Sequence, residues 1–177
     1  GYIGYIDINC IVNGKGIYPL EFTSRFGYPT IQIQQEGILS PLGEWLLKLA
    51  AGENFELKTK RGFQIGVRIM VPTYFSKSKD KETIEMYRDL PILFKHPESR
   101  EGIHIEDIKN DNGVWRIAGE SGCLLVVTGS ATTVAETQAQ VYLRIKNIMV
   151  QNMFYRTDIG AKWTADSDKL QTWGYLY

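Results

Sequence analysis

Leu20-Glu21-Phe22-Thr23-Ser24-Arg25-Phe26-Gly27-Tyr28-Pro29-Thr30 is the stretch that decides how the first part of the chain folds. It continues an apolar run that begins at Ile17, and further back polar and apolar residues alternate from Tyr2 to Val12. Between the two runs stands Asn13-Gly14-Lys15-Gly16, a glycine-rich segment that is typical of tight turns. The pattern predicts a β-hairpin whose second strand leads directly into the quoted stretch.

The predicted hairpin brings four oxygen-bearing side chains to one level. Residues two apart on a strand share a face, so two side chains from each strand point the same way. They are Asp7, Asn9, Glu21 and Thr23. Mg²⁺ takes oxygen ligands, keeps several waters and is usually held by one or two carboxylates together with phosphates. These four residues are therefore the predicted ligands of a Mg²⁺ (or Mn²⁺) ion that carries a polyphosphate.

Arg25 stands just beyond this patch and is the candidate catalytic cation. Its forked guanidinium could bind phosphate or carboxylate oxygens through two parallel hydrogen bonds, and Gly27 would let the backbone come close. A structural interpretation stays open as well. Glu21 could simply face water, Arg25 could pair with Glu21 at the surface, and residues 27–29 could form a plain turn.

The overall charge argues against binding to nucleic acid or to an anionic membrane. The 177 residues contain 20 lysines and arginines and 20 aspartates and glutamates, so no net field attracts nucleic acid or an anionic membrane. Hydrophobic residues make up 44% of the chain, which is enough to bury a core. No apolar run reaches the roughly 20 residues of a membrane-spanning helix, and no signal peptide opens the chain. We expect a soluble, cytoplasmic protein that binds neither nucleic acid nor membrane.

The two cysteines and the first residue carry further expectations. Cys10 and Cys123 each stand in an apolar, strand-like run and are expected to be buried thiols in a reducing compartment, since no Cys/His cluster has zinc spacing. The chain begins with Gly1 and a strand pattern follows at once. This indicates a fragment of a longer polypeptide, with an N-terminal part missing.

A helix is predicted soon after the hairpin. Ser40 is its expected N-cap, Pro41 stands in its first turn, and Gly52 would end it after Ala51. Apolar residues recur on one face at helical spacing, which places Trp45 in a core and not in a stacking platform.

From Phe55 onward the pattern changes to strands, followed by one long helix. Strand-like runs occupy residues 66–71, 102–108, 114–118 and 123–128. A capping box of Thr133 and Glu136 begins the helix, whose apolar stripe extends to Ile148. The charged segment 76–82 is expected to be a surface excursion. These features predict an α+β fold with a small antiparallel sheet or partial barrel closed by the long helix.

Two motifs resemble the C-terminal part of the phosphoribosylamine-glycine ligase family, which belongs to the ATP-grasp superfamily. That family typically carries Glu-Phe-Asn, a spacer and Arg-Phe-Gly-Asp-Pro-Glu, which is similar to residues 21–30. It ends with Tyr-Arg-x-Asp-Ile-Gly after a helix, which is similar to Tyr155-Arg156-Thr157-Asp158-Ile159-Gly160. The likeness extends over nearly the whole chain and is specific at these two ends.

The resemblance implies both an architecture and a reaction. Residues 1–54 would be the C-terminal portion of an ATP-grasp domain, and residues 55–177 would form a C-terminal ligase domain. The reaction would be ATP- and magnesium-dependent, with glycine activated as an acyl phosphate and the amine of phosphoribosylamine forming the amide in purine synthesis. Glu21 would ligate the metal, and the turn of Gly27, Tyr28 and Pro29 would face phosphate or substrate beside Arg25.

Three departures from the family motif leave alternatives open. Thr23 stands where the family has asparagine, Tyr28 where it has aspartate, and Thr30 where it has glutamate. We expect Asp7 or Asn9 across the hairpin to compensate for the weaker ligand Thr23. The substrate could differ, as in another ATP-grasp carboxylate-amine ligase, or the chain could be a non-catalytic binding module derived from this fold. The 177 residues alone are expected to be inactive.

Overall fold

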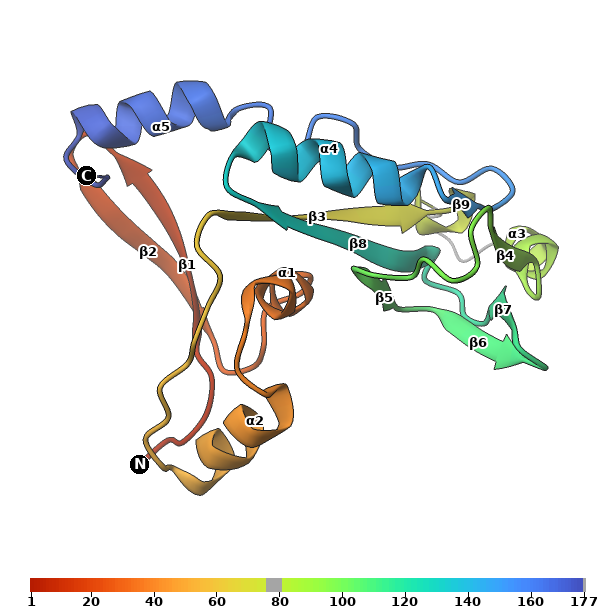
Figure 1. Cartoon of the computed structure of the whole chain (residues 1–177), viewed down its shortest axis with the longest axis horizontal. Helices are drawn as coiled ribbons and strands as arrows, with labels where there is room; N and C mark the ends of the chain where they lie inside the picture. The colour runs from red at the N-terminus through yellow and green to blue at the C-terminus, as the bar shows by residue number, and fades with distance from the viewer. Residues whose placement is uncertain (76–80, 177) are drawn as a thin grey trace.

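The architecture is taken from a computed structural model that describes residues 1–75 and 81–176 (Figure 1). The predicted surface excursion at 76–82 falls mostly outside these residues. The elements in chain order are β1 (Asp7–Asn13), β2 (Gly16–Thr23), α1 (Thr30–Gly37), α2 (Leu42–Ala51), β3 (Phe63–Met70), the 3-10 helix η1 (Pro72–Phe75), α3 (Lys81–Tyr87), β4 (Pro91–Phe94), β5 (Ile103–Ile105), β6 (Ile108–Asp111), β7 (Val114–Ile117), β8 (Cys123–Ala131), α4 (Val134–Ile145), β9 (Ile148–Met149) and α5 (Trp163–Thr172).

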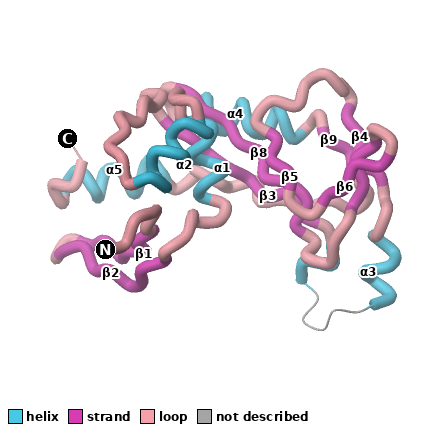
Figure 2. Tube along the Cα trace, turned by 90° about the horizontal axis from the view of Figure 1, so that it is seen from below, coloured by secondary structure: helices cyan, strands magenta, loops and turns pink. Residues whose placement is uncertain are grey.

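The hairpin of β1 and β2 has the predicted antiparallel pairing and stands apart from the sheets (Figures 1 and 2). It pairs with no other strand of the described part of the chain. Many of its apolar side chains are exposed, Phe22 to 71%. Cys10 is exposed as well, so the expectation of a buried thiol there is wrong, because no layer covers the hairpin. Cys123 is buried, as expected.

Helices α1 and α2 follow the hairpin. No sequence pattern indicated α1, a glutamine-rich helix that is stabilised by its contacts with β3 and β8. Helix α2 was predicted, and Gly52 ends it in the left-handed conformation with φ 69°. Its N-cap is Pro41 and not Ser40, because the Ser40 hydroxyl accepts a hydrogen bond from the Lys58 amide instead.

The apolar face of α2 is only half-buried. No residue of the helix is fully buried, and Leu47 is 72% exposed. Trp45 is therefore not a core residue, contrary to expectation. It packs at 6.0 Å from Phe26, measured between ring centroids, and forms part of a cavity wall.

Two antiparallel sheets carry the rest of the fold, which confirms the α+β class. One has the order β3-β8-β5 and the other β6-β7-β4-β9. Helix α4 lies along β3 and β8, as Figure 1 shows. Both faces of β8 are covered by helices, α4 and α1. Its sequence is therefore a nearly unbroken apolar run. Fully buried side chains of this core are Val67, Ile69, Leu124, Leu125, Val126, Val127, Val141 and Ile145.

The ends of α4 follow the sequence closely. The Thr133 hydroxyl accepts from the Glu136 amide, and the Glu136 carboxylate accepts from the Thr133 amide, so the predicted capping box is present. The helix stops at Ile145, and Ile148 belongs to β9 and not to the helical stripe. Helix α5 was not foreseen. Within the described residues, no helix combines the length and apolar character needed to cross a bilayer.

Candidate functional site

The hairpin register sets the four predicted metal ligands opposite one another. Asp7 faces Thr23 and Asn9 faces Glu21 across the two strands. The Asn9 amide donates a hydrogen bond of 3.0 Å to a carboxylate oxygen of Glu21. Glu21 and Asn9 are exposed, and Asp7 and Thr23 are half-buried. The side chains thus form an open, oxygen-rich patch that is not sealed by apolar packing.

Gly27 brings the following loop against this patch. A Cβ atom added at Gly27 would lie 2.5 Å from Asp7 Oδ2 and 3.0 Å from the side chain of Thr30. Any larger residue would therefore displace the Asp7 carboxylate or the start of α1. The close neighbours of Gly27 are thus Asp7 and Thr30 of the chain itself, and the expected approach of this backbone to a phosphate stays a prediction.

The donor set suits a hard cation that is bound mainly by its own phosphate and water ligands. Asp7 and Glu21 supply two carboxylates, and Asn9 and Thr23 supply neutral oxygens. In the described part of the chain there is no group of three or more His, Cys, Asp or Glu side chains that could hold a metal. Two carboxylates match what Mg²⁺ takes from a protein when phosphates supply further ligands. The patch would thus hold the ion weakly unless a nucleotide accompanies it.

Arg25 does not join the patch in this structure. Its Nη1 donates to the carbonyl oxygen of Phe26 at 2.9 Å, and the side chain is exposed. No ion pair between Arg25 and Glu21 is formed among the described residues. The surface pairing that offered a structural interpretation of Arg25 is therefore not seen, and the guanidinium remains accessible to a ligand.

Tyr28 turns from the patch toward the three-stranded sheet. Its hydroxyl lies 3.2 Å from the Cys123 sulfur, and the Arg68 guanidinium stacks 4.2 Å from the centre of its ring. Burial, together with the Cys123 contact, raises the pKa of the Tyr28 hydroxyl far above its usual value. Burial also raises the pKa of Cys123. Tyr28 thus fastens the motif loop to β8 as a neutral phenol.

A cavity of about 340 Å³ lies where the motif loop, β3 and the C-terminal motif meet. Pro29 contributes from the loop, Arg68 from β3 and Arg156 from the C-terminal motif. Arg68 Nη1 donates to the Tyr74 hydroxyl at 3.2 Å, but its Nε is buried and has no hydrogen-bond partner among the described residues. Buried donors of this kind are normally satisfied, so the Arg68 Nε is an exception in the wall of this cavity.

Arg156 is held in place by its own motif. Its Nε and Nη2 donate to the two carboxylate oxygens of Asp158 at 2.8 and 2.6 Å. Sequence reasoning named these two residues but missed Arg68. The signal was present, because Arg68 is the one charged residue in the apolar run 66–71, and such a residue needs a partner.

A chain of polar contacts ties α1 to the sheet behind the site. The Glu36 carboxylate accepts from the Thr128 hydroxyl at 2.8 Å and pairs with Arg144 at 3.4 Å. His104 Nε2 lies 3.0 Å from the same hydroxyl. Since the Thr128 proton points to Glu36, His104 donates to Thr128 as a neutral imidazole. Burial lowers the pKa of His104, and its contact with Thr128 makes it part of the packing behind the site.

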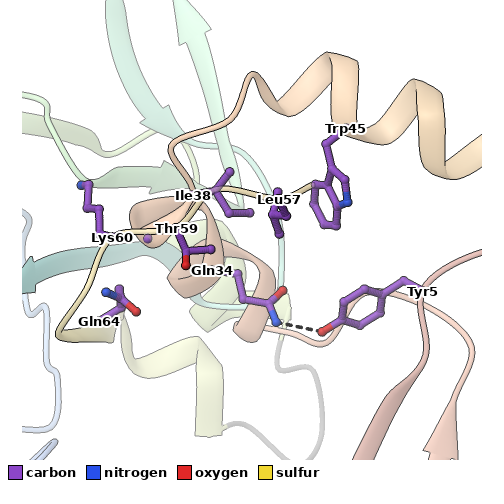
Figure 3. A pocket seen from close by; sticks show the side chains of 9 residues that line it. Tyr5, Gln34, Ile38, Trp45, Leu57, Thr59, Lys60 and Gln64 are labelled. Carbon is purple, nitrogen blue, oxygen red and sulfur yellow. Dashed lines mark hydrogen bonds between the residues drawn. The ribbon is translucent and has the colours of Figure 1, made fainter. Parts of the chain in front are cut away.

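A second cavity, of about 300 Å³, shares no lining residue with the first (Figure 3). It lies among the N-terminal segment, α1, α2, the segment before β3, and β3 itself. Its wall includes Tyr5, Gln34, Trp45 and Lys60. None of these residues was proposed as a site from the sequence.

Comparisons with known proteins agree with the two motifs. No protein-family model matches the chain. A phosphoribosylamine-glycine ligase from Halalkalibacterium halodurans is 27% identical over 168 residues, which cover 93% of this chain and 36% of that protein. The enzyme of the same name from Streptococcus pneumoniae is 26% identical over 165 residues, 91% of this chain and 36% of that protein. The chain resembles the C-terminal part of phosphoribosylamine-glycine ligases.

A solved structure has a similar fold. The crystal structure of phosphoribosylamine-glycine ligase from Thermotoga maritima superposes with a TM-score of 0.66 at 20% identity, covering 86% of this chain and 36% of that one. The predicted resemblance is thus confirmed in sequence and in fold. The chain spans about 36% of the length of these two curated relatives.

Proposed function

We propose that this chain is the C-terminal part of an ATP-dependent carbon-nitrogen ligase of purine biosynthesis that joins glycine to phosphoribosylamine. The observation that carries the proposal is the hairpin register, in which Asn9 faces Glu21 and Asp7 faces Thr23 beside the Gly27 loop. Relatives that match over more than 90% of this chain are named phosphoribosylamine-glycine ligase. We also propose that the chain divides into two domains, an ATP-grasp portion at residues 1–54 and a C-terminal ligase domain at residues 55–177.

The residues of the hairpin would position nucleotide phosphates. Glu21 and Asp7 would hold a Mg²⁺ or Mn²⁺ ion, with Asn9 and Thr23 as neutral partners, and a bound ion would neutralise charge on the transferring phosphoryl group. Arg25 would swing from the Phe26 carbonyl to the phosphate or to the substrate carboxylate. Gly27 keeps the loop close enough for both contacts.

The cavity between the loop and the C-terminal motif would receive the acid or phosphate part of a substrate. Arg68 Nε is a buried donor that has no acceptor in the part of the chain that the structure describes, and Arg156 is fixed by Asp158 at the same cavity. Glycine would be activated by transfer of the ATP γ-phosphoryl group to its carboxylate. The amine of phosphoribosylamine would then displace phosphate and form the amide. In this scheme the chain supplies positioning and charge neutralisation.

The exposed hairpin supports the proposal that a further segment of the same polypeptide packs on it. Its apolar side chains Ile8, Leu20 and Phe22 are 48%, 63% and 71% exposed, and it pairs with no further strand in the described residues. The relatives are nearly three times as long as the matched region. We propose that an N-terminal ATP-grasp portion completes this sheet and the ATP site, so that the 177 residues alone turn over nothing.

One structural feature favours a second candidate, another carboxylate-amine ligase with a different substrate. Tyr28 takes the place of an acidic family residue and is committed to Cys123 and Arg68, so this side chain offers no carboxylate to an amine. In both candidate ligases Glu21 would hold the metal ion. The two candidates differ in the amine that the reaction consumes.

The proposal is tested on the longest polypeptide that carries this chain. Formation of the glycine amide of phosphoribosylamine is measured in the presence of ATP and Mg²⁺, with other amines tried in parallel. Glu21→Ala should lower kcat by about 100-fold, because it removes a preorganised charge at the phosphoryl group. Glu44→Ala, which removes an exposed carboxylate from α2, serves as the matched control.

Three outcomes separate the candidates. Amide formation with phosphoribosylamine supports the proposal, and turnover only with another amine supports the second ligase. Magnesium-dependent ATP binding without turnover indicates a binding module. Full activity of Glu21→Ala, or measurable ligase activity of the 177 residues by themselves, contradicts the arrangement proposed here.

A further inference from the structure

The second cavity has an apolar, aromatic side. Trp45, Ile38 and Leu57 form this side, and Figure 3 shows the Trp45 indole at one end of it. The indole is held by a row of rings, because Phe26 lies 6.0 Å from Trp45 and 4.8 Å from Tyr5, measured between ring centroids. A planar ring could pack against such a wall with little loss of side-chain freedom.

The opposite side of the cavity offers hydrogen-bond donors. Figure 3 shows Lys60 and Gln64 across the view from Trp45. The Gln34 amide donates to the Tyr5 hydroxyl at 2.9 Å, which leaves the hydroxyl proton of Tyr5 for another acceptor. The Thr59 hydroxyl also lines the cavity. These groups converge from four different segments of the chain.

Lys60 gives the wall of the second cavity a positive charge. It is the one charged side chain among the lining residues, and the backbone is fixed there by a 2.7 Å hydrogen bond from the Lys60 amide to the Gly37 carbonyl. Its ammonium lies 3.7 Å from Glu36, whose carboxylate has closer partners in Thr128 and Arg144. The side chain is 40% exposed, and its ammonium, which Figure 3 shows pointing away from Trp45, would turn toward a ligand in the cavity.

We propose that this cavity binds a small aromatic carboxylate. The ring would lie against Trp45, Ile38 and Leu57, and the carboxylate would accept from Lys60 and Thr59. A volume of about 300 Å³ suits a ligand of this size and not a nucleoside triphosphate. The proposal is independent of the ligase activity, because the two cavities share no residue and binding is its readout.

The test compares two ligands of the same shape and different charge. Indole-3-acetate and the uncharged indole-3-acetamide are titrated into the protein by calorimetry at pH 7. The acid should bind about tenfold more tightly, as expected for one charge-assisted contact at a partly exposed site. Trp45→Leu should weaken both ligands, because each loses the ring wall.

Variants at Lys60 decide whether charge recognition comes from this cavity. Lys60→Met should remove the preference for the acid, and Lys60→Arg should keep it while preserving the pair with Glu36. Lys58→Met, two residues away and outside the cavity lining, is the control and should leave the preference unchanged. Thermal unfolding by circular dichroism checks that each variant is folded.

Clear results would overturn the proposal. Equal affinities for acid and amide in the unmodified protein would exclude recognition of the carboxylate. Absence of saturable binding for both ligands would exclude the site. Retention of the preference in a folded Lys60→Met variant would place the carboxylate elsewhere.

Discussion

Gly27 is the position where the motif loop touches the hairpin. Gly27→Ala would place a methyl carbon 2.5 Å from Asp7 Oδ2, so the carboxylate has to move. We expect the affinity for ATP in the presence of Mg²⁺ to fall about tenfold, with a stability loss of about 1 kcal/mol. Calorimetric titration of the longest polypeptide that carries this chain measures the affinity.

Gly43→Ala is the matched control for this substitution. Apart from its chain neighbours and the backbone of α2 itself, no atom of the described residues lies within 4 Å of a Cβ added at Gly43, which is inside α2. Alanine there should stabilise the protein by up to about 1 kcal/mol and leave nucleotide affinity unchanged. Equal affinities of the Gly27→Ala and Gly43→Ala variants would show that Asp7 takes no part in nucleotide binding.

His104 gives the fold a dependence on pH. Burial lowers its pKa below the ordinary value of 6.5, so the unfolded chain binds a proton more readily than the folded one. The contribution of His104 to stability is complete above pH 6.5 and is lost as the pH falls through the lowered pKa. Nearby Glu36 opposes this shift and Arg144 adds to it.

Urea unfolding at pH 7.5 and at pH 5 measures this effect. The free energy of unfolding of the unmodified protein should fall on acidification by more than that of His104→Gln, which keeps a neutral donor toward Thr128. Burial raises the pKa of Glu106, so this residue stabilises the fold on acidification and opposes the effect of His104. Both proteins contain Glu106, so its contribution cancels when their free energies of unfolding are compared. An identical pH dependence in both would mean that His104 titrates normally.

At the scale of elements, the hairpin is held at both of its ends. At its base, Tyr5 packs on Phe26 and accepts a hydrogen bond from Gln34 of α1. At its tip, the segment after α5 covers the turn. The Tyr175 hydroxyl donates to the Asn13 carbonyl at 3.2 Å, and the Trp173 indole would lie 3.0 Å from a Cβ added at Gly14.

Loss of the second attachment should loosen the hairpin selectively. In a Trp173→Ala, Tyr175→Ala double variant, amide hydrogen exchange of β1 and β2 should accelerate about tenfold, while β3 and β8 stay protected. Lys169→Ala, on the exposed side of α5, is the control. Unchanged exchange in the hairpin would show that the base alone fixes it.

Elements with a strong local pattern were predictable and others were not. The existence of the hairpin follows from alternation and a glycine turn, whereas its register, with a shift between Asn9 and Cys10, was left open, and α4 follows from its capping box. Helix α1 has the composition of a polar loop, and only its contacts with β3 and β8 make it stable. Helix α5 likewise has no buried residue, so it leaves no apolar stripe in the sequence.

At the scale of the whole molecule, the candidate site combines local and distant contacts. The four oxygen-bearing groups come from one hairpin and could be placed by spacing. The orientation of Tyr28 depends on Cys123, 95 residues away, and the roles of Arg68 and Arg156 depend on how β3 and the C-terminal motif meet the loop. Pairings over such separations are set by packing, which one sequence does not reveal.

The bare edges of the hairpin also affect how the protein can be handled. In the part of the chain that the structure describes, no further strand pairs with this apolar ribbon, and such unpaired backbone N–H and C=O groups are a template for strands from a neighbouring molecule. The exposed Cys10 thiol on the same ribbon could lock such a contact as an intermolecular disulfide. Samples of the 177 residues alone should therefore keep best when dilute and with a reductant.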